Sequence, residues 1–162
     1  MSKYLGMFVD DDLRNYESIR RLFTLKGIDL LPYEKLPENI DDIYKKALDN
    51  SVDFIIIDYD LGKQAVKYTG IDVLKNIREQ DAEIYIIYLT NKEFVEDHIG
   101  DFDQTVKKKD FAKEVGNVVN RLVRALSREL SIKNEREIDS SYEIQKKYLD
   151  DRIALLKEQL KK

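Results

Sequence analysis

Four polar residues in this sequence stand directly after short apolar runs, where they could do chemistry together. In chain order they are the pair Asp10 and Asp11, then Asp58, then Thr90. Carboxylates held close to one another need a cation, and Mg²⁺ suits a few carboxylates together with waters and a phosphate oxygen. A carboxylate beside such a metal can act as a nucleophile toward phosphorus. The residue types therefore predict phosphoryl transfer, in which Thr90 would hydrogen-bond a phosphoryl oxygen and a nearby lysine would pair with its charge.

The apolar runs that position these residues are typical of strands buried on both faces of a parallel sheet. The strong runs cover residues 4–9, 54–57 and 84–89, and weaker strand signals lie at 28–31 and around 105–106. The strong runs are rich in β-branched and aromatic residues and do not alternate with polar ones. Ligands of such sheets bind outside the carboxyl ends of the strands, where the strand order reverses. We therefore expect the polar residues to converge at one edge of the sheet.

Amphipathic helical patterns separate the strands. They cover residues 16–23, 40–48, 71–77, a short stretch near 94–99, and 111–126. Asp110 is the expected N-cap of the last of these helices. Strands that alternate with helices imply right-handed crossover connections. The predicted fold class is α/β, a five-stranded doubly wound parallel sheet covered by helices.

The chain changes character after about residue 126. No Gly or Pro follows Gly116, and residues 131–141 are polar. Apolar residues then recur at spacings of seven, four, three and four, at Tyr142, Leu149, Ile153, Leu156 and Leu160. This pattern favours a heptad seam in which Lys146 is off-pattern. We expect an α/β domain over residues 1–125 and a helical extension over 126–162 that forms a coiled coil.

Composition excludes several classes of function. The formal net charge is −4, with basic and acidic residues interspersed, so the clustered positive charge of a nucleic-acid-binding surface is missing. The sequence has no cysteine, which excludes disulfides and thiolate metal sites. No apolar stretch approaches the 18 residues or so of a membrane-spanning helix, and the start of the chain lacks the pattern of a signal peptide. The expected location is the cytoplasm.

Four short motifs, in order along the chain, resemble the signature of response-regulator receiver domains, the CheY-like family of two-component signalling. They are an acidic pair after the first strand, DFIIID at the end of the third, LT at the end of the fourth and VKK after the fifth. The stretch GIDVLKNIRE also resembles the third helix of that family. The resemblance covers residues 3 to about 125, and it implies the flavodoxin-like receiver fold.

The resemblance also implies a role for each residue of the site. Asp58 is the expected phospho-acceptor, Thr90 the switch hydroxyl and Lys108 the lysine that pairs with the phosphoryl group. The implied Mg²⁺ ligands are Asp10, Asp11, Asp58 and the backbone carbonyl of Asp60. Lys107 stays an alternative to Lys108 because three lysines stand in a row. Lys108 is preferred because Val106-Lys107-Lys108 matches the apolar-any-Lys ending of the family.

By this resemblance the chain takes a phosphoryl group from a histidine kinase or a phosphotransfer protein and is not itself an enzyme. The helical extension is expected to form a homodimer. A phosphorylation-independent binding module is the first alternative, because three positions depart from the family. Gly62 replaces the usual proline, Asn91 a smaller residue and Thr105 the usual switch aromatic.

A phosphatase of the haloacid-dehalogenase type is the second alternative, since Asp58-Tyr59-Asp60 after an apolar strand resembles its opening motif. In that family the metal-binding acidic pair follows the nucleophile, whereas Asp10 and Asp11 precede it here. The order of the motifs therefore disfavours the phosphatase.

Overall fold

The computed structural model describes residues 4–10, 12–33, 35–59, 61, 66–91 and 101–160. The chain divides into two units, Met1–Val123 and Arg124–Lys162. The first unit contains a sheet and its flanking helices, and the second is helical.

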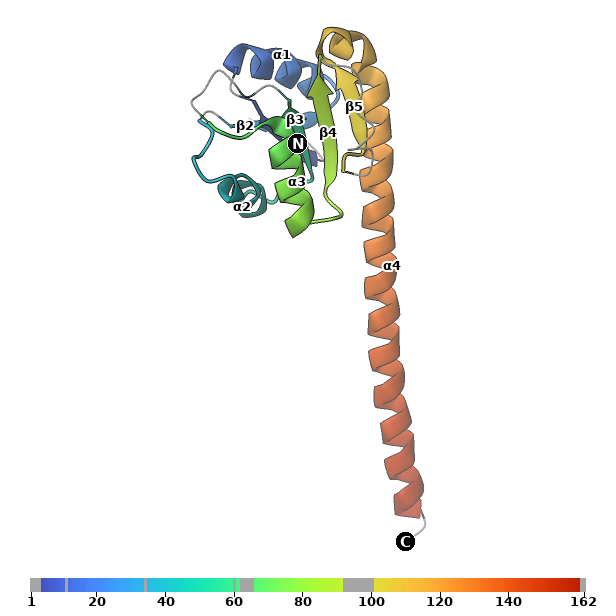
Figure 1. The fold of residues 1–162 in the computed structure, drawn as a ribbon. Helices are drawn as coiled ribbons and strands as arrows, with labels where there is room; N and C mark the ends of the chain where they lie inside the picture. Colours follow the sequence, from blue (N-terminus) through green and yellow to red (C-terminus); the bar gives the residue numbers. More distant parts are fainter. Residues whose placement is uncertain are drawn as a thin grey trace. The chain divides into compact units, whose positions relative to one another are not determined.

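The described residues of the first unit form a five-stranded parallel sheet in the order β2-β1-β3-β4-β5 (Figure 1). The strands are β1 (Tyr4–Val9), β2 (Ile28–Pro32), β3 (Phe54–Asp58), β4 (Tyr85–Thr90) and β5 (Gln104–Lys107). The chain order reverses at β1, so β1 and β3 are neighbours and form the switch point of the doubly wound sheet. The predicted fold class, including each of the five strands, is confirmed.

The helices lie between the strands as the sequence predicts. They are α1 (Leu13–Thr24), α2 (Asp41–Asp49), α3 (Gly70–Gln80) and α4 (Phe111–Leu160), the last preceded by a 3-10 turn, η2 (Lys108–Asp110). Asp110 is the last residue of this turn and directly precedes α4, and its role as an N-cap stays a prediction. The predicted short helix at 94–99 lies outside the described residues.

Local capping fixes the starts of the helices nearest the candidate site. Asp12 is the N-cap of α1, and its side chain accepts a hydrogen bond from the Arg14 N–H at 2.9 Å. Thr69 and Asp72 form a capping box at the start of α3, in which each side chain accepts from the other's backbone N–H. Both helices therefore begin at defined residues just beyond the ends of β1 and β3.

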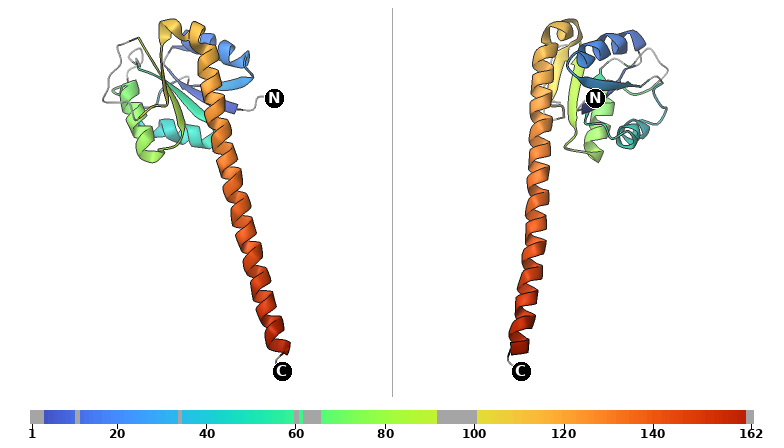
Figure 2. Two further views of the ribbon diagram at one scale, coloured as in Figure 1. Left: turned by 90° about the vertical axis from the view of Figure 1, so that its right-hand side faces the viewer. Right: turned by 180° about the vertical axis from the view of Figure 1, so that it is seen from behind.

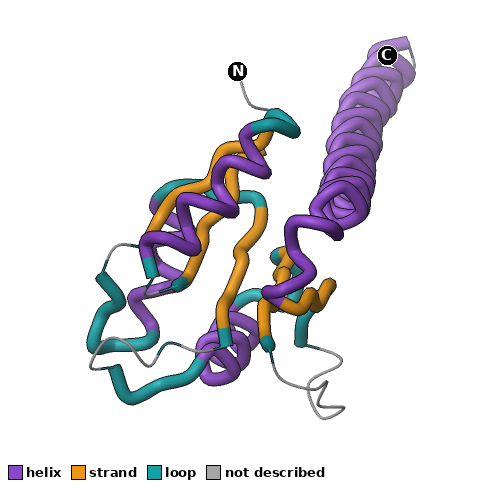
Figure 3. The backbone as a smooth tube through the Cα atoms, turned by 90° about the horizontal axis from the view of Figure 1, so that it is seen from above, coloured by secondary structure: helices purple, strands orange, loops and turns teal. Residues whose placement is uncertain are grey.

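Helices cover both faces of the sheet (Figures 2 and 3). On one face, apolar residues of α2 and α3, such as Ile43 and Leu74, share a core cluster with Ile55 and Ile57 of β3. On the other face, the ring of Phe23 from α1 stacks on Phe54 and on Phe111 at centroid distances of 5.8 and 6.0 Å. The ring of Phe23 therefore joins α1 to β3 and to the start of α4.

Two polar side chains fix the position of β5, the edge strand next to β4. Arg78 of α3 donates hydrogen bonds to the carbonyls of Asp101 and Ile84, and it forms an ion pair with Asp103 at 2.9 Å. Gln104, buried at the start of β5, donates to the Tyr85 hydroxyl and to the Val118 carbonyl. Apart from the bond to Ile84, which precedes β4, each bond ties β5 or the residues just before it to elements that precede or follow it in the chain.

The second unit is the remainder of helix α4, which continues without a break to Leu160 as predicted. Its large apolar side chains are exposed, among them Tyr142, Leu149 and Leu160. Among the helices that the structure describes, none combines the length and apolar character needed to cross a membrane.

Gly70 lies where α3 begins against the end of β3. A Cβ atom added there would lie 2.7 Å from the Tyr59 Cα atom and would also overlap the backbone of Asp58.

We predict that Gly70→Ala lowers the free energy of unfolding by about 1–3 kcal/mol, because backbone atoms cannot move aside as the end of a flexible side chain can. Gly116→Ala is the matched control. Nothing lies within 4 Å of its added Cβ, so this helical site should gain about 0.5–1 kcal/mol. Urea denaturation measures both, and equal effects would contradict the prediction.

Tyr44 and Asp81 form a bond between α2 and the residue after α3. The Tyr44 hydroxyl donates to the Asp81 carboxylate at 2.6 Å. Burial is the main cause that raises the pKa of Tyr44 to about 12, and the hydrogen bond to Asp81 adds to the increase. Burial opposes ionisation of Asp81, but the hydrogen bonds from Tyr44 and from the Glu83 and Ile84 N–H groups together lower its pKa.

We predict that Tyr44→Phe lowers the free energy of unfolding by about 1 kcal/mol at neutral pH, because the charge-assisted bond is lost. The folded-state pKa of Asp81 is depressed, so this contribution is present above its unfolded pKa of about 3.9 and is lost as the pH falls through the folded value. Urea denaturation of both proteins at neutral and acidic pH measures the difference. A difference that grows on acidification would contradict the assignment.

Candidate functional site

Two buried carboxylates lie side by side at the carboxyl ends of β1 and β3. Val9 and Ile57 are partners in the parallel register, so Asp10 and Asp58 each come one residue beyond a paired position. Their exposed fractions are 5% and 1%. The switch point of the sheet therefore holds two acidic groups that are almost excluded from water.

The carboxylate of Asp10 is held by the start of α1. Its Oδ1 accepts from the Asp12 N–H at 3.0 Å, and its Oδ2 accepts from the Asn15 side-chain amide at 3.3 Å. Asp12 is thus the N-cap of α1, and its backbone N–H also orients Asp10. Asn15 was not identified from the sequence, where an Asn on an amphipathic helix gives no distinctive signal.

The carboxylate of Asp58 forms an ion pair with Lys108. The Lys108 ammonium contacts Asp58 Oδ2, and the lysine side chain retains 24% of its exposure. Lys107 is the last residue of β5 and lies in register with Thr90 of β4. Of the two lysines that the sequence leaves open, the structure brings Lys108 to Asp58, because the 3-10 turn begins at that residue.

Backbone hydrogen bonds fix the chain on both sides of Asp58. The Tyr59 N–H donates to the Leu89 carbonyl at 2.9 Å, and the Gly70 N–H donates to the Tyr59 carbonyl at 3.0 Å. Leu89 is also the register partner of Asp58, and Thr90 follows it with an exposed fraction of 7%. The threonine is therefore at the same edge of the sheet as Asp58, on the adjacent strand.

The donor set at this edge is of the kind that Mg²⁺ prefers. Asp10 and Asp58 supply hard carboxylate oxygens from neighbouring strands. Within the described part of the chain, no cluster of three or more potential metal-ligating side chains occurs. Asp11 and Asp60, the other two predicted ligands, lie outside the described residues. The residues that are described fit a magnesium ion held jointly with further oxygen ligands.

A cavity of about 160 Å³ opens beside these residues, between α1 and the first residues of α4. Its lining residues are Asp10, Asn15, Ser18, Ile19, Leu22, Leu89, Lys108, Phe111 and Ala112. Asp10 and Lys108 thus line this cavity, and Lys108 also pairs with Asp58.

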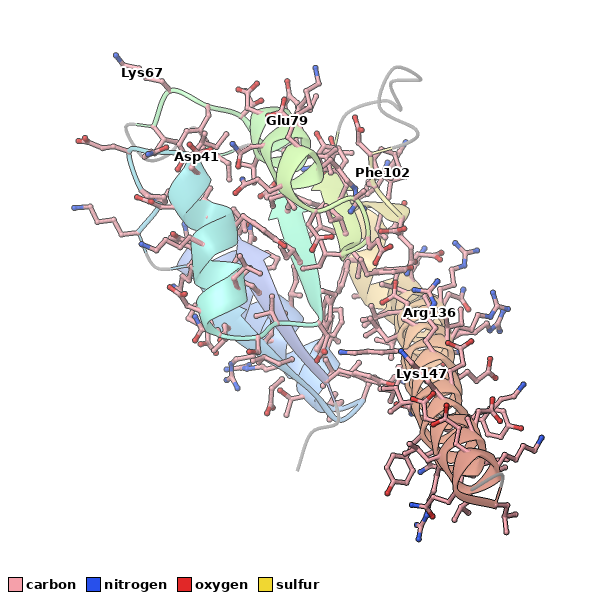
Figure 4. The ribbon with its side chains drawn as sticks, turned by 90° about the horizontal axis from the view of Figure 1, so that it is seen from below. Asp41, Lys67, Glu79, Phe102, Arg136 and Lys147 are labelled. Atoms are coloured by element: carbon pink, nitrogen blue, oxygen red, sulfur yellow. The ribbon has the colours of Figure 1, made fainter. Side chains whose placement is uncertain are left out.

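Three aromatic rings pack together on the other side of the site. Tyr88 stacks on Phe102 at 5.7 Å and meets the edge of Tyr59 at 6.4 Å (Figure 4 labels Phe102). Burial raises the pKa of Tyr88. Tyr88 of β4 therefore links Tyr59, the residue after Asp58, to Phe102. Thr105, in the place of the family's switch aromatic, is exposed on β5.

Comparison with known proteins gives matches among solved structures. No protein-family model matches the chain, and no curated protein matches it either. NtrX from Brucella abortus is 16% identical with a TM-score of 0.65, over 83% of this chain and 29% of that one. The signal receiver domain of a putative LuxO repressor protein from Vibrio parahaemolyticus is 19% identical with a TM-score of 0.62, over 78% and 95% of the two chains.

The response regulator TrrA from Thermotoga maritima, solved in complex with Mg²⁺ and BeF, is 22% identical with a TM-score of 0.59, over 75% of this chain and 99% of that one. The chain thus spans less than a third of NtrX and nearly the full length of the other two. At these identities the likeness establishes the fold. The chain has the flavodoxin-like fold of receiver domains, as the sequence motifs predict.

We predict that Lys108→Met lowers the free energy of unfolding by about 1–3 kcal/mol in the absence of Mg²⁺, because the buried Asp58 carboxylate loses its cation. Lys107→Met is the matched control, since it changes the adjacent residue and keeps the ion pair. Urea denaturation should show the larger loss for Lys108→Met, and Mg²⁺ should reduce that loss. Identical unfolding midpoints for the two variants would refute a stabilising role of the ion pair.

Proposed function

We propose that this chain is a phospho-accepting receiver of a two-component phosphorelay, with Asp58 as the acceptor and Mg²⁺ as its cofactor. The observation that carries the proposal is the buried Asp58 carboxylate at the switch point of a receiver fold, paired with Lys108 and next to Asp10. The proposed receiver domain is residues 1–125, and residues 126–162 are its helical extension.

In the proposed reaction, an Asp58 oxygen attacks the phosphorus of a phosphohistidine on a histidine kinase or phosphotransfer protein. A P–O bond forms, the P–N bond breaks, and the histidine keeps the electron pair. Mg²⁺ supplies charge neutralisation for the phosphoryl oxygens, as in other phosphoryl transfers. The proposed ligands are Asp10, Asp11, Asp58 and the backbone carbonyl of Asp60. TrrA was solved in complex with Mg²⁺ and BeF, which supports by analogy the choice of Mg²⁺ as the cofactor.

Lys108 and Thr90 are proposed to respond to the new phosphoryl group. Lys108 already contacts Asp58 and would transfer its ion pair to a phosphoryl oxygen, while the Thr90 hydroxyl would donate a hydrogen bond to another. Because Thr90 ends β4 and Lys108 directly follows β5, phosphorylation would bias an existing two-state equilibrium at the ends of these strands. The protein would catalyse no turnover beyond the loss of its own phosphoryl group.

The proposed partners are a cytoplasmic histidine kinase or phosphotransfer protein and further copies of this chain bound through the helical extension. Neither nucleic acid nor membrane is a proposed partner. A phosphorylation-independent binding module is the second candidate, favoured by the exposed Thr105 where the family carries its switch aromatic. A phosphatase of the haloacid-dehalogenase type is disfavoured, because its acidic pair would have to follow Asp58 at a strand end.

Intact-mass spectrometry after acetyl phosphate treatment, with and without Mg²⁺, tests the proposal. We predict a single phosphoryl adduct that requires Mg²⁺ and disappears in Asp58→Asn. Asp49→Asn, an exposed aspartate at the end of α2, is the matched control and should keep the adduct. A folded wild-type protein that forms no adduct, either with acetyl phosphate or with a histidine phosphotransfer protein as donor, would favour the binding module instead.

A further inference from the structure

The last part of α4, residues 142–160, exposes more apolar surface than a solvated helix needs. The Ile, Leu and Tyr side chains of this segment have exposed fractions between 51% and 86%. They are Tyr142, Ile144, Tyr148, Leu149, Ile153, Leu155, Leu156 and Leu160. Isolated apolar residues on a surface need no explanation, but a contiguous group this large indicates an interaction site.

Around the helix axis, the large apolar residues of this segment lie on one half of the helix, and all of its charged residues except one lie on the other half. At about 100° per residue, all eight apolar residues fall within one half of the helix, together with two glutamines and a single charged residue, Arg152. The other half holds every remaining charge and one alanine. Its members are Glu143, Lys146, Lys147, Asp150, Asp151, Ala154, Lys157 and Glu158, of which Lys147 is labelled in Figure 4. We call the first half the uncharged face.

The uncharged face is wider than the seam of a two-stranded coiled coil. The heptad seam accounts for five of its apolar residues, from Tyr142 to Leu160. Ile144, Tyr148 and Leu155 lie about 130° away around the helix, where a single partner helix on the seam does not reach. Their exposed fractions are 71%, 63% and 61%. A narrow stripe is typical of a two-stranded coiled coil, whereas a wide apolar face is typical of a helix that packs into a bundle.

The exposed areas of the seam and of the flanking residues also favour a bundle over a two-stranded coiled coil. The seam residues expose on the order of 600 Å² per helix, somewhat less than one partner contributes to a standard-size interface. The three flanking residues expose on the order of 400 Å² more, which a dimer through the seam would leave in water. A second neighbouring helix is needed to cover them.

The charges favour copies of this chain as the neighbours. The charged half carries three lysines and four acidic residues, interspersed along the helix, so tails placed side by side would not accumulate charge of one sign. Arg152 lies between the seam and the flanking residues. Its long side chain can pack its methylene groups on the apolar surface and extend the guanidinium to water. The face is therefore complementary to itself.

We infer that the helical extensions of three or more copies of this chain associate into a helical bundle in which each tail contacts two others. The seam forms one contact, and the group of Ile144, Tyr148 and Leu155 forms the other. Since the bundle depends on the sequence and exposure of residues 142–160 alone, it forms whether or not Asp58 accepts a phosphoryl group.

Sedimentation equilibrium of the full chain at tens of micromolar, without phosphorylation, tests the inference. The expected mass is that of a trimer or larger. The double variant Ile144→Glu, Leu155→Glu should reduce it to a dimer or monomer, because charges would occupy the second contact. The double variant Lys147→Gln, Glu158→Gln, on the charged half, is the matched control and should leave the mass unchanged. Circular dichroism checks that the variants keep their helices.

A wild-type chain that sediments as a monomer or dimer would overturn the inference and would assign the uncharged face to a different protein. It would also be overturned if the Ile144→Glu, Leu155→Glu variant kept the wild-type mass. Neither result bears on the phosphoryl adduct at Asp58, which is measured by mass spectrometry, so the two proposals fail separately.

Discussion

The ion pair between Asp58 and Lys108 joins the ends of β3 and β5, two strands that are separated in the sheet by β4. A carboxylate buried to this extent costs several kcal/mol unless a cation and hydrogen bonds compensate it. Its burial therefore requires that the end of β5 be held in place. Arg78 fixes the residues before β5, and Gln104 fixes the start of the strand to Tyr85 and to the carbonyl of Val118. These two polar side chains, remote from the acidic edge, determine where Lys108 lies.

The sequence predicts the sheet because whole runs of apolar residues, rather than single residues, indicate the strands. Each of the strong apolar runs is long enough to be unambiguous, and a polar residue that ends such a run must lie at the carboxyl edge of a parallel sheet. The positions of Asp10, Asp58 and Thr90 follow from that rule without any knowledge of side-chain contacts. The continuity of α4 is equally predictable, since no Gly or Pro interrupts it after Gly116.

The sequence does not reveal residues whose role depends on one contact with a residue far away in the chain. Asn15 and Gln104 act through bonds to Asp10 and Tyr85, and neither residue stands in a periodic pattern that would mark it. The choice between Lys107 and Lys108 is made by a turn of three residues, too short for a propensity argument. The same turn comes directly before α4 and is equally invisible in the sequence. The roles of the site residues in phosphoryl transfer stay predictions, as does the metal.

The hydrogen bond from the Gly70 N–H to the Tyr59 carbonyl joins the two ends of the loop that connects β3 to α3. The entropy of closing a loop grows only slowly with its length, by about 0.6 kcal/mol for each doubling. The length of this loop therefore has little effect on stability by itself, and the loop is held at particular residues instead: Leu61 is buried, and the Tyr68 hydroxyl donates to the Pro37 carbonyl. Thr69 caps α3 at the end of the same connection, so the start of that helix is held both by the loop and by Tyr59.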